Sequence, residues 1–373
     1  MQEQLYQILL YFFYFIVAIQ GVFIIIIFPR VLFFNKKKNE ENTVKEAVSV
    51  VIAAKDEYYN LRNFLPKVLN QDYPDFEVIV VNNGSEDDSE FILREMQTKY
   101  SNFKYINVQS NANFFDGKKF PLSIGIKSSK NDLLLLTDAD CYPASPNWIS
   151  NIVKSYNENT EIVLAYGGYE ERKGLFNKIL RYDTLRVALL YFSFAAWKMP
   201  YMGVGRNLSY RKSLFYKQKG FTKHYTTASG DDDLFVNKAA NKKNTSINID
   251  ADTKTISLPK ETFKEWIKQK RRHYTSGKHY KKWHLLFLGL WESSSVFYFI
   301  LTIVFISLNF HTYLVLYILL TRTLINYFLI KKLTKILKER KLLLLSPLLE
   351  FIMVLLGTLL SMSNLLYKQR KWK

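Results

Sequence analysis

Apolar runs of strand length alternate with helical patterns between residues 48 and 138. The runs that predict β-strands cover residues 48–54, 76–81, 103–108 and 133–136, and the periodic segments that predict helices cover 61–69, 88–100 and 120–126. Strands that alternate with helices favour parallel pairing through right-handed crossovers. The pattern therefore predicts an α/β domain, a Rossmann-like mixed sheet with helices on both faces.

Polar side chains follow three of these strands where each strand ends. They are Asp56 and Glu57, Asn82 and Asn83, and Asp138 and Asp140. Ligands bind beyond the carboxyl ends of the strands in such sheets. Residues i and i+2 of an extended chain point to the same side, so Asp138 and Asp140 can offer two carboxylates to one hard divalent cation. One such pair alone indicates an acidic turn; three polar clusters at one sheet edge predict a site.

Hydrophobic segments long enough to cross a bilayer lie outside this domain. Three are predicted to span a membrane, at residues 5–28, 285–307 and 312–330. A further apolar stretch, 342–366, contains Pro347 and Glu350, and it predicts either a fourth span or a re-entrant hairpin.

The formal net charge is +19, and the basic residues bunch beside the apolar segments. The bunches lie at 36–38, 260–282, 331–341 and 368–373. This placement is typical of cytoplasmic membrane flanks, and it argues against a nucleic-acid-binding surface. The single cysteine, Cys141, excludes a disulfide framework and fits a reducing cytoplasm.

These features predict an integral protein of the inner (cytoplasmic) membrane with its α/β domain in the cytoplasm. The predicted organisation is an anchor at 1–34, an α/β domain at 45–283 and membrane segments with a basic tail at 284–373. Two further segments inside the domain bear on its contact with the membrane. Residues 187–197 predict either a core helix or an interfacial helix, and 266–283 predict an interfacial basic segment leading into the second span.

An ordered set of motifs over about 45–275 resembles the inverting family 2 glycosyltransferases of GT-A fold, in their membrane-anchored bacterial form. The motifs are VSVVIAAKDE (48–57), VVNNGS (80–85), GKK (117–119), TDAD (137–140), GVGRNLSYRK (203–212), GDDDL (230–234) and QKRR (269–272). The resemblance implies transfer of a sugar from a nucleotide-sugar donor to a hydroxyl of a lipid or membrane-linked glycan. The alternative is a catalytically silent sugar-nucleotide-binding membrane partner of a polysaccharide assembly complex.

The resemblance also implies a donor site. The residues that would contact the donor are Ala53, Asp56, Glu57, Asn82, Asn83, Lys118, Asp138 and Arg206. Asp138 and Asp140 would hold Mg²⁺ or Mn²⁺ on the diphosphate. The family usually has aspartate where this chain has Asn82 and Asn83; an amide still accepts from a uracil N–H, so a UDP-sugar is favoured.

For the chemical step, the resemblance implies a general base among the acids before residue 234. Counting back from Leu234 favours Asp231, whereas the position of the acid pair favours Asp232; three acids at this place also fit an ordinary helix N-terminus. Arg272 would stabilise the departing diphosphate. His273 stands where the family has tryptophan, and it would assist Arg272 in this role.

Overall fold

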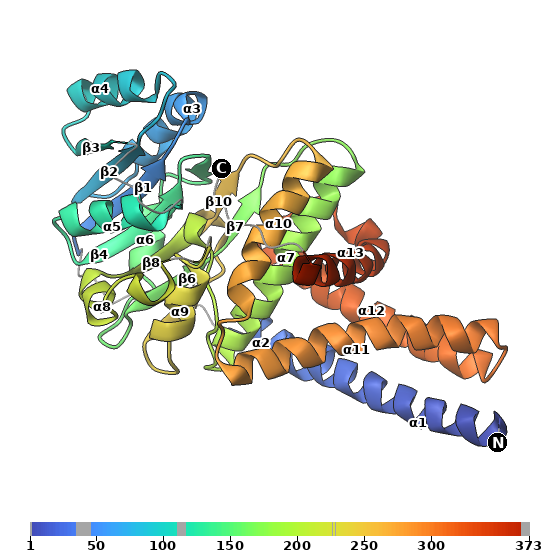
Figure 1. Ribbon diagram of the computed structural model, residues 1–373. Helices are drawn as coiled ribbons and strands as arrows, with labels where there is room; N and C mark the ends of the chain where they lie inside the picture. The colour runs from blue at the N-terminus through green and yellow to red at the C-terminus, as the bar shows by residue number, and fades with distance from the viewer. Residues whose placement is uncertain (1, 35–45, 110–116, 226, 228, 367–373) are drawn as a thin grey trace.

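The computed structural model describes residues 2–34, 46–109, 117–225, 227 and 229–366. Within them, an α/β unit lies at one end and long helices extend from the other (Figure 1). The predicted basic bunches at 36–38 and 368–373 lie outside the described residues.

A seven-stranded sheet forms the centre of the α/β unit. Its order is β3 (Phe103–Val108), β2 (Phe76–Asn83), β1 (Val48–Ala54), β4 (Leu133–Asp138), β8 (Leu208–Arg211), β6 (Ile162–Ala165) and β9 (Thr245–Asn248). The first four strands are parallel, as the alternation predicted, and β8 runs antiparallel to both of its neighbours. The carboxyl ends of β1, β2 and β4 therefore meet at one edge.

Helices cover both faces of this sheet because alternate residues of each buried strand point to opposite sides. Val50 and Ile52 of β1 face one hydrophobic cluster, and Val51 and Ala53 face another. The first cluster includes α3 (Tyr58–Leu69), α4 (Ser89–Lys99) and α6 (Trp148–Val153). The second includes α5 (Lys119–Ser128), α7 (Leu175–Ala196), α8 (Lys212–Lys217) and α9 (Asp233–Ala239).

A second, three-stranded sheet extends the domain beside the end of β4. It contains β5 (Cys141–Pro143), β10 (Thr255–Ser257) and β7 (Gly167–Tyr169) in that order. Since β5 follows β4 after only two residues, this small sheet lies directly next to Asp138 and Asp140.

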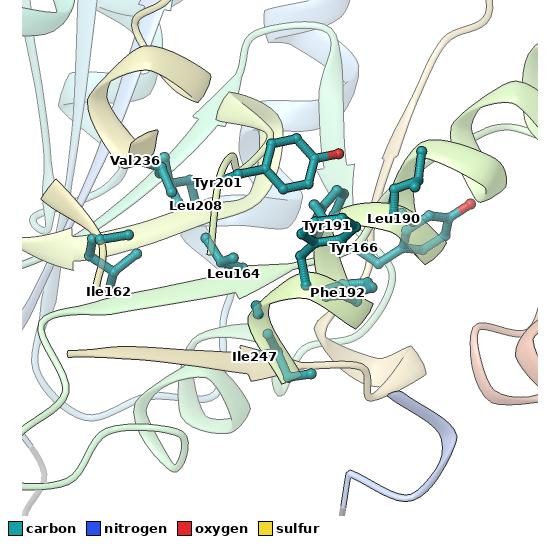
Figure 2. Packing of buried hydrophobic residues seen from close by; sticks show 14 of the residues in the cluster. Ile162, Leu164, Tyr166, Leu190, Tyr191, Phe192, Tyr201, Leu208, Val236 and Ile247 are labelled. Atoms are coloured by element: carbon teal, nitrogen blue, oxygen red, sulfur yellow. The ribbon is translucent and has the colours of Figure 1, made fainter. Parts of the chain in front are cut away.

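The apolar segment 187–197 belongs to the hydrophobic core, which decides between the two predictions made for it. Figure 2 shows Leu190, Tyr191 and Phe192 of α7 packed beside Tyr166 and Leu164 of the sheet region. Phe192 is fully buried, and only the end of the segment is open, where Trp197 is 41% exposed. α7 is thus a core helix.

In the part of the chain that the structure describes, four helical segments are long and apolar enough to cross a membrane: Glu3–Leu32, Lys282–Ser307, Thr312–Ile336 and Leu343–Ser363. The first comprises α1 (Gln2–Gly21), a π-helical turn (Val22–Ile27) and α2 (Pro29–Leu32), and the others are α11 (Lys282–Ser307), α12 (Thr312–Ile336) and most of α13 (Ser346–Leu366). α13 is one continuous helix, so the predicted hairpin alternative for 342–366 is wrong.

Pro347 and Glu350, the two residues that suggested a hairpin, are both accommodated within the continuous helix α13. Pro347 lies in the first turn, where a missing N–H costs nothing. Glu350 accepts hydrogen bonds from Arg322 at 2.7 Å and from Asn326 at 2.8 Å, and Arg322 also donates to Gln20 at 2.6 Å. These bonds satisfy buried polar groups on α1, α12 and α13.

Buried charges attach the candidate membrane helices to the α/β unit. The Glu339 side chain, just after α12, is fully buried and accepts from Arg181 of α7 at 2.7 Å and from Lys254. Tyr166 donates a further hydrogen bond to Glu339 at 3.3 Å. Removing one member of such a network would leave the others buried and unpaired, so the network fixes how the two parts sit together.

The basic segment 266–283 is not an open interfacial surface throughout. Most of it forms α10 (Phe263–Gly277), which begins with a capping box between Thr262 and Glu265. Trp266 is buried, and Lys270 pairs with Asp183 of α7 at 2.7 Å in the interior. The prediction of an interfacial segment is therefore wrong for these two side chains.

Candidate active site

A single cavity of about 1150 Å³ opens at the carboxyl ends of β1 and β4. It brings together most of the residues that the sequence singled out: Ala53, Glu57, Lys118, Asp138, Asp140, Arg206, Asp231, Asp232, Arg272 and His273. They come from six separate stretches of chain, between residues 53 and 273. Their convergence supports one site rather than a set of unrelated turns.

Asp138, the last residue of β4, and Asp140 just after it both line this cavity. Ligand atoms of Asp138, Asp140 and the neighbouring Cys141 lie within 4.8 Å of one another. Two carboxylates suit Mg²⁺ or Mn²⁺, which prefer oxygen ligands. Burial raises the pKa of the Cys141 thiol, and its sulfur hydrogen-bonds with Ser257 Oγ at 2.8 Å, so Cys141 is a poor ligand for a hard cation. Asp138 and Asp140 fit the cation.

Lys118 links the acids of β4 to those before α9. Its ammonium group pairs with Asp138 and lies 4.0 Å from Asp231 Oδ2. Burial would lower the pKa of Lys118, but the carboxylates of Asp138 and Asp231 together raise it above its usual range. The lysine therefore remains charged, and it could hold a phosphate oxygen in the same place.

Three consecutive acids at the N-terminus of α9 have three different environments. Asp232 accepts from Gly205 N–H and from Asp233 N–H, both at 2.7 Å, and it is the N-cap of α9. Asp233 accepts from Ser276 and, at 2.8 Å, from Tyr280. Burial and the flanking carboxylates raise the pKa of Asp232 to about 8. Asp231 instead faces Lys118, as described above.

The helix-cap alternative therefore describes Asp232 and Asp233, whose oxygens bind backbone or neighbouring side chains. Asp231 contributes its carboxylate to the cavity without capping the helix.

α10 supplies a further wall of the cavity. Arg272 and His273 both line the cavity. Burial, with Arg272 and Lys270 nearby, lowers the pKa of His273 well below its usual range. His273 is therefore neutral near pH 7 and can act as a hydrogen-bond donor or acceptor, but not as a standing positive charge.

Arg206 is held at the junction of the two sheets. Its guanidinium lies 4.6 Å from the ring centre of Tyr169, and Nη1 donates to Ser257 Oγ at 3.3 Å. The backbone carbonyl of Arg206 accepts hydrogen bonds from the side chains of Thr137 and Thr255. These bonds fix the turn Gly205–Asn207 to β4 and β10.

Three predicted donor-site residues do not line this cavity. Asp56, with a left-handed φ of 54°, accepts from Glu86 N–H at 2.8 Å and joins the loops after β1 and β2. Asn82 is buried, and its side chain accepts a hydrogen bond from Ser85 at 2.5 Å and donates one to Asn107 at 3.0 Å. Asn83 is buried beside it.

Several cavity residues were missed from the sequence. Asp183 and Arg186 of α7, and Glu292 of α11, line its far side. A signal was available for α7, because Asp183 and Arg186 are three residues apart and therefore share one face of a helix. The glycines and hydroxyls of α11 and α13 that also line the cavity carried no such signal.

Comparison with known proteins gives the family of the domain. Residues 49–223 match the family model described as glycosyl transferase family 2. Glycosyltransferase AglE of Haloferax volcanii is 30% identical over 125 residues, which are 33% of this chain and 39% of that protein. The 4,4'-diaponeurosporenoate glycosyltransferase of Staphylococcus haemolyticus is 30% identical over 140 residues, or 35% and 36% of the two chains. The chain thus spans less than two fifths of either relative.

Among solved structures, a mannosyltransferase from Pyrobaculum calidifontis, in complex with GDP-Man and Mn²⁺, superposes with a TM-score of 0.52. It is 16% identical, and the match covers 87% of this chain and all of that one, which shows a common fold. Together with the sheet order and the helices on both faces, these matches show that the chain carries a glycosyl transferase family 2 domain of GT-A fold.

Proposed function

We propose that this protein is a membrane-anchored, inverting glycosyltransferase. It would move one sugar from a nucleotide-sugar donor, with UDP-sugars favoured, to a hydroxyl of a lipid or membrane-linked glycan. One observation carries the proposal: the same cavity contains a paired carboxylate site, a set of acids before α9 and a basic wall from α10. These are the groups that diphosphate binding, acceptor deprotonation and leaving-group stabilisation require.

In this proposal, Asp138 and Asp140 would hold the divalent cation, which would neutralise the negative charge of the donor diphosphate. Lys118 and Arg272 add positive charge on that side of the cavity. Glu57, fixed by an Asn60 hydrogen bond at 2.5 Å, would orient the nucleoside. Asp56, Asn82 and Asn83 would act by shaping the two loops around it, since they do not line the cavity.

Inversion requires attack from the face opposite the leaving group. The acceptor hydroxyl loses its proton to Asp231 while its oxygen bonds to the anomeric carbon, and the bond from that carbon to the diphosphate oxygen breaks. The nucleoside diphosphate leaves with both electrons of that bond. Asp231 is preferred over Asp232 because Asp232 is held by two backbone N–H groups.

The experiment that tests this function is nucleotide release by the purified full chain with UDP-, GDP- and dTDP-sugars and membrane lipids. One donor class is expected to be turned over, and Arg272→Ala is expected to lower turnover ~10²–10³-fold, the usual cost of losing one group that stabilises developing charge. Donor binding without turnover in every lipid mixture would favour the silent binding partner instead.

We also propose that the α/β unit lies in the cytoplasm, where nucleotide sugars are made, because basic residues gather after α12 and around α10. A cysteine in place of Tyr313, which is 91% exposed in the first turn of α12, is expected to react with an impermeant maleimide added to intact cells. A cysteine at the exposed Lys335 is expected to react only after lysis. The native Cys141 is buried and gives little background. The reverse labelling pattern would overturn the orientation.

A further inference from the structure

The cavity continues beyond the catalytic acids into a membrane-side arm along α7, α11 and α13. Gly289 and Ser293 of α11, and Gly357 and Ser361 of α13, line this arm. In each helix the two residues are four apart and share one face. A Cβ on Gly289 would meet no described atom within 4 Å, and one on Gly357 would meet only Tyr274 and Arg186, at 3.9 and 4.0 Å. Both helices thus leave open space between them.

Two buried polar atoms of α7 in this arm have no hydrogen-bond partner among the described residues: Asp183 Oδ1 and Arg186 Nε. The side chain of Asp183 is only 5% exposed. A buried polar atom without a partner costs free energy unless a ligand supplies one. Here an acceptor and a donor lie one helical turn apart, which matches a hydroxyl group that donates one bond and accepts another.

The charges of the arm are already paired. Asp183 Oδ2 binds Lys270 at 2.7 Å, and Arg186 Nη1 binds the two oxygens of Glu292 at 3.0 and 3.1 Å. Two cations and two anions cancel, so the arm offers no surplus positive charge to a phosphate. Arg272 lies on a different face of α10 from Lys270, on the side of the donor.

An apolar exit leads out of the arm. Met362 of α13 lines the arm and is 61% exposed, and Leu359 on the same helix is 62% exposed. Because α11 and α13 are both long and apolar enough to lie in a membrane, an acyl or prenyl chain could leave between them into lipid.

We propose that this arm is the acceptor subsite, and that the acceptor is a lipid whose headgroup is uncharged and bears hydroxyls. The headgroup would contact Asp183 and Arg186, and the tail would pass between Gly289 and Gly357. The inference rests on the proposed glycosyltransferase function and specifies its acceptor.

The test uses the full chain in phosphatidylcholine nanodiscs with two probes of equal tail length, octyl β-glucoside and octyl phosphate. Octyl β-glucoside is expected to bind saturably and more tightly than octyl phosphate. Gly289→Leu and Gly357→Leu fill the arm from two different helices, and each is expected to weaken octyl β-glucoside binding ~10-fold or more. Gly21→Leu is the matched control, because Gly21 lies in a membrane helix outside the cavity and its Cβ would also meet nothing within 4 Å.

Tighter binding of octyl phosphate, absence of saturable octyl β-glucoside binding, or wild-type affinity in both leucine variants would each overturn the acceptor assignment. Nucleotide-sugar binding and release by the wild-type chain are measured in the same nanodiscs. If the chain neither binds nor turns over any donor, the glycosyltransferase proposal itself fails. If donor turnover is intact but the probes give one of these contradicting results, only the acceptor assignment fails.

Discussion

Asp231→Asn is expected to lower sugar transfer ~10²–10⁴-fold, the usual contribution of a positioned general base, while nucleotide-sugar affinity and stability stay close to wild type. The amide is nearly isosteric with the carboxylate, but it cannot take a proton from the acceptor. Asp231 lines the cavity 4.0 Å from Lys118 and does not cap α9, so the fold loses little. Transfer to a lipid acceptor, donor binding and the thermal midpoint are measured together.

Asp232→Asn is expected to give a different result. Its two oxygens accept from Gly205 N–H and Asp233 N–H, whereas asparagine has one accepting oxygen and an NH₂ group that would face the other donor. This mismatch is expected to cost about 1–3 kcal/mol of stability, seen as a lower thermal midpoint. Asp75→Asn, at the exposed opposite edge of the sheet, serves as the control for both variants.

Two results would contradict the assignment of the base. If Asp232→Asn loses transfer at wild-type stability while Asp231→Asn keeps it, the base is Asp232. If both variants transfer sugar at wild-type rates, neither acid is the base.

Removing the divalent cation is the second large perturbation. Asp138→Ala, Asp140→Ala and treatment with excess chelator are each expected to lower donor turnover by at least ~10²-fold, because the diphosphate charge is then left without its main counterion. Mn²⁺ binding by calorimetry gives a readout independent of turnover, and both alanine variants are expected to lose it.

Asp75→Ala is the matched control for the cation site, since it removes an exposed carboxylate far from the cavity. Wild-type turnover in excess chelator, or unchanged Mn²⁺ affinity in both alanine variants, would remove Asp138 and Asp140 from the proposed metal site. Asp138→Ala also frees Lys118, so agreement between the two variants is needed before the loss is attributed to the cation.

The order of the local elements could be predicted from the sequence because it depends on short-range periodicity. The apolar run of β4 ends at Asp138, and the β-branched run of β1 ends just before the polar residues 55–57, so both strands and their carboxyl ends were predicted correctly. Parallel pairing of β1 with β2 and β4 followed from the helical crossovers between them. The apolar lengths of α11 and α12 likewise identified candidate membrane spans.

Contacts between distant parts of the chain decided the rest. The sequence left both Asp231 and Asp232 as candidates for the base, and contacts with Gly205, 27 residues from Asp232, and with Lys118 beside Asp231 distinguish their environments. Asn82 resembled a ligand-binding residue, yet Asn107 on the neighbouring strand uses its amide. The continuity of α13 through Glu350 depends on Arg322 of another helix, which satisfies that carboxylate.

The sequence by itself therefore determined the four parallel strands, the helices between them and the apolar spans, and which strand ends carry carboxylates, because backbone geometry repeats over two to four residues. The tertiary structure decided which of those side chains bind other protein groups and which remain open to a ligand. That distinction depends on the partner that each side chain meets after folding, as Asp183 and Arg186 show. The cavity beside them forms only once α13 packs against α7, α10 and α11.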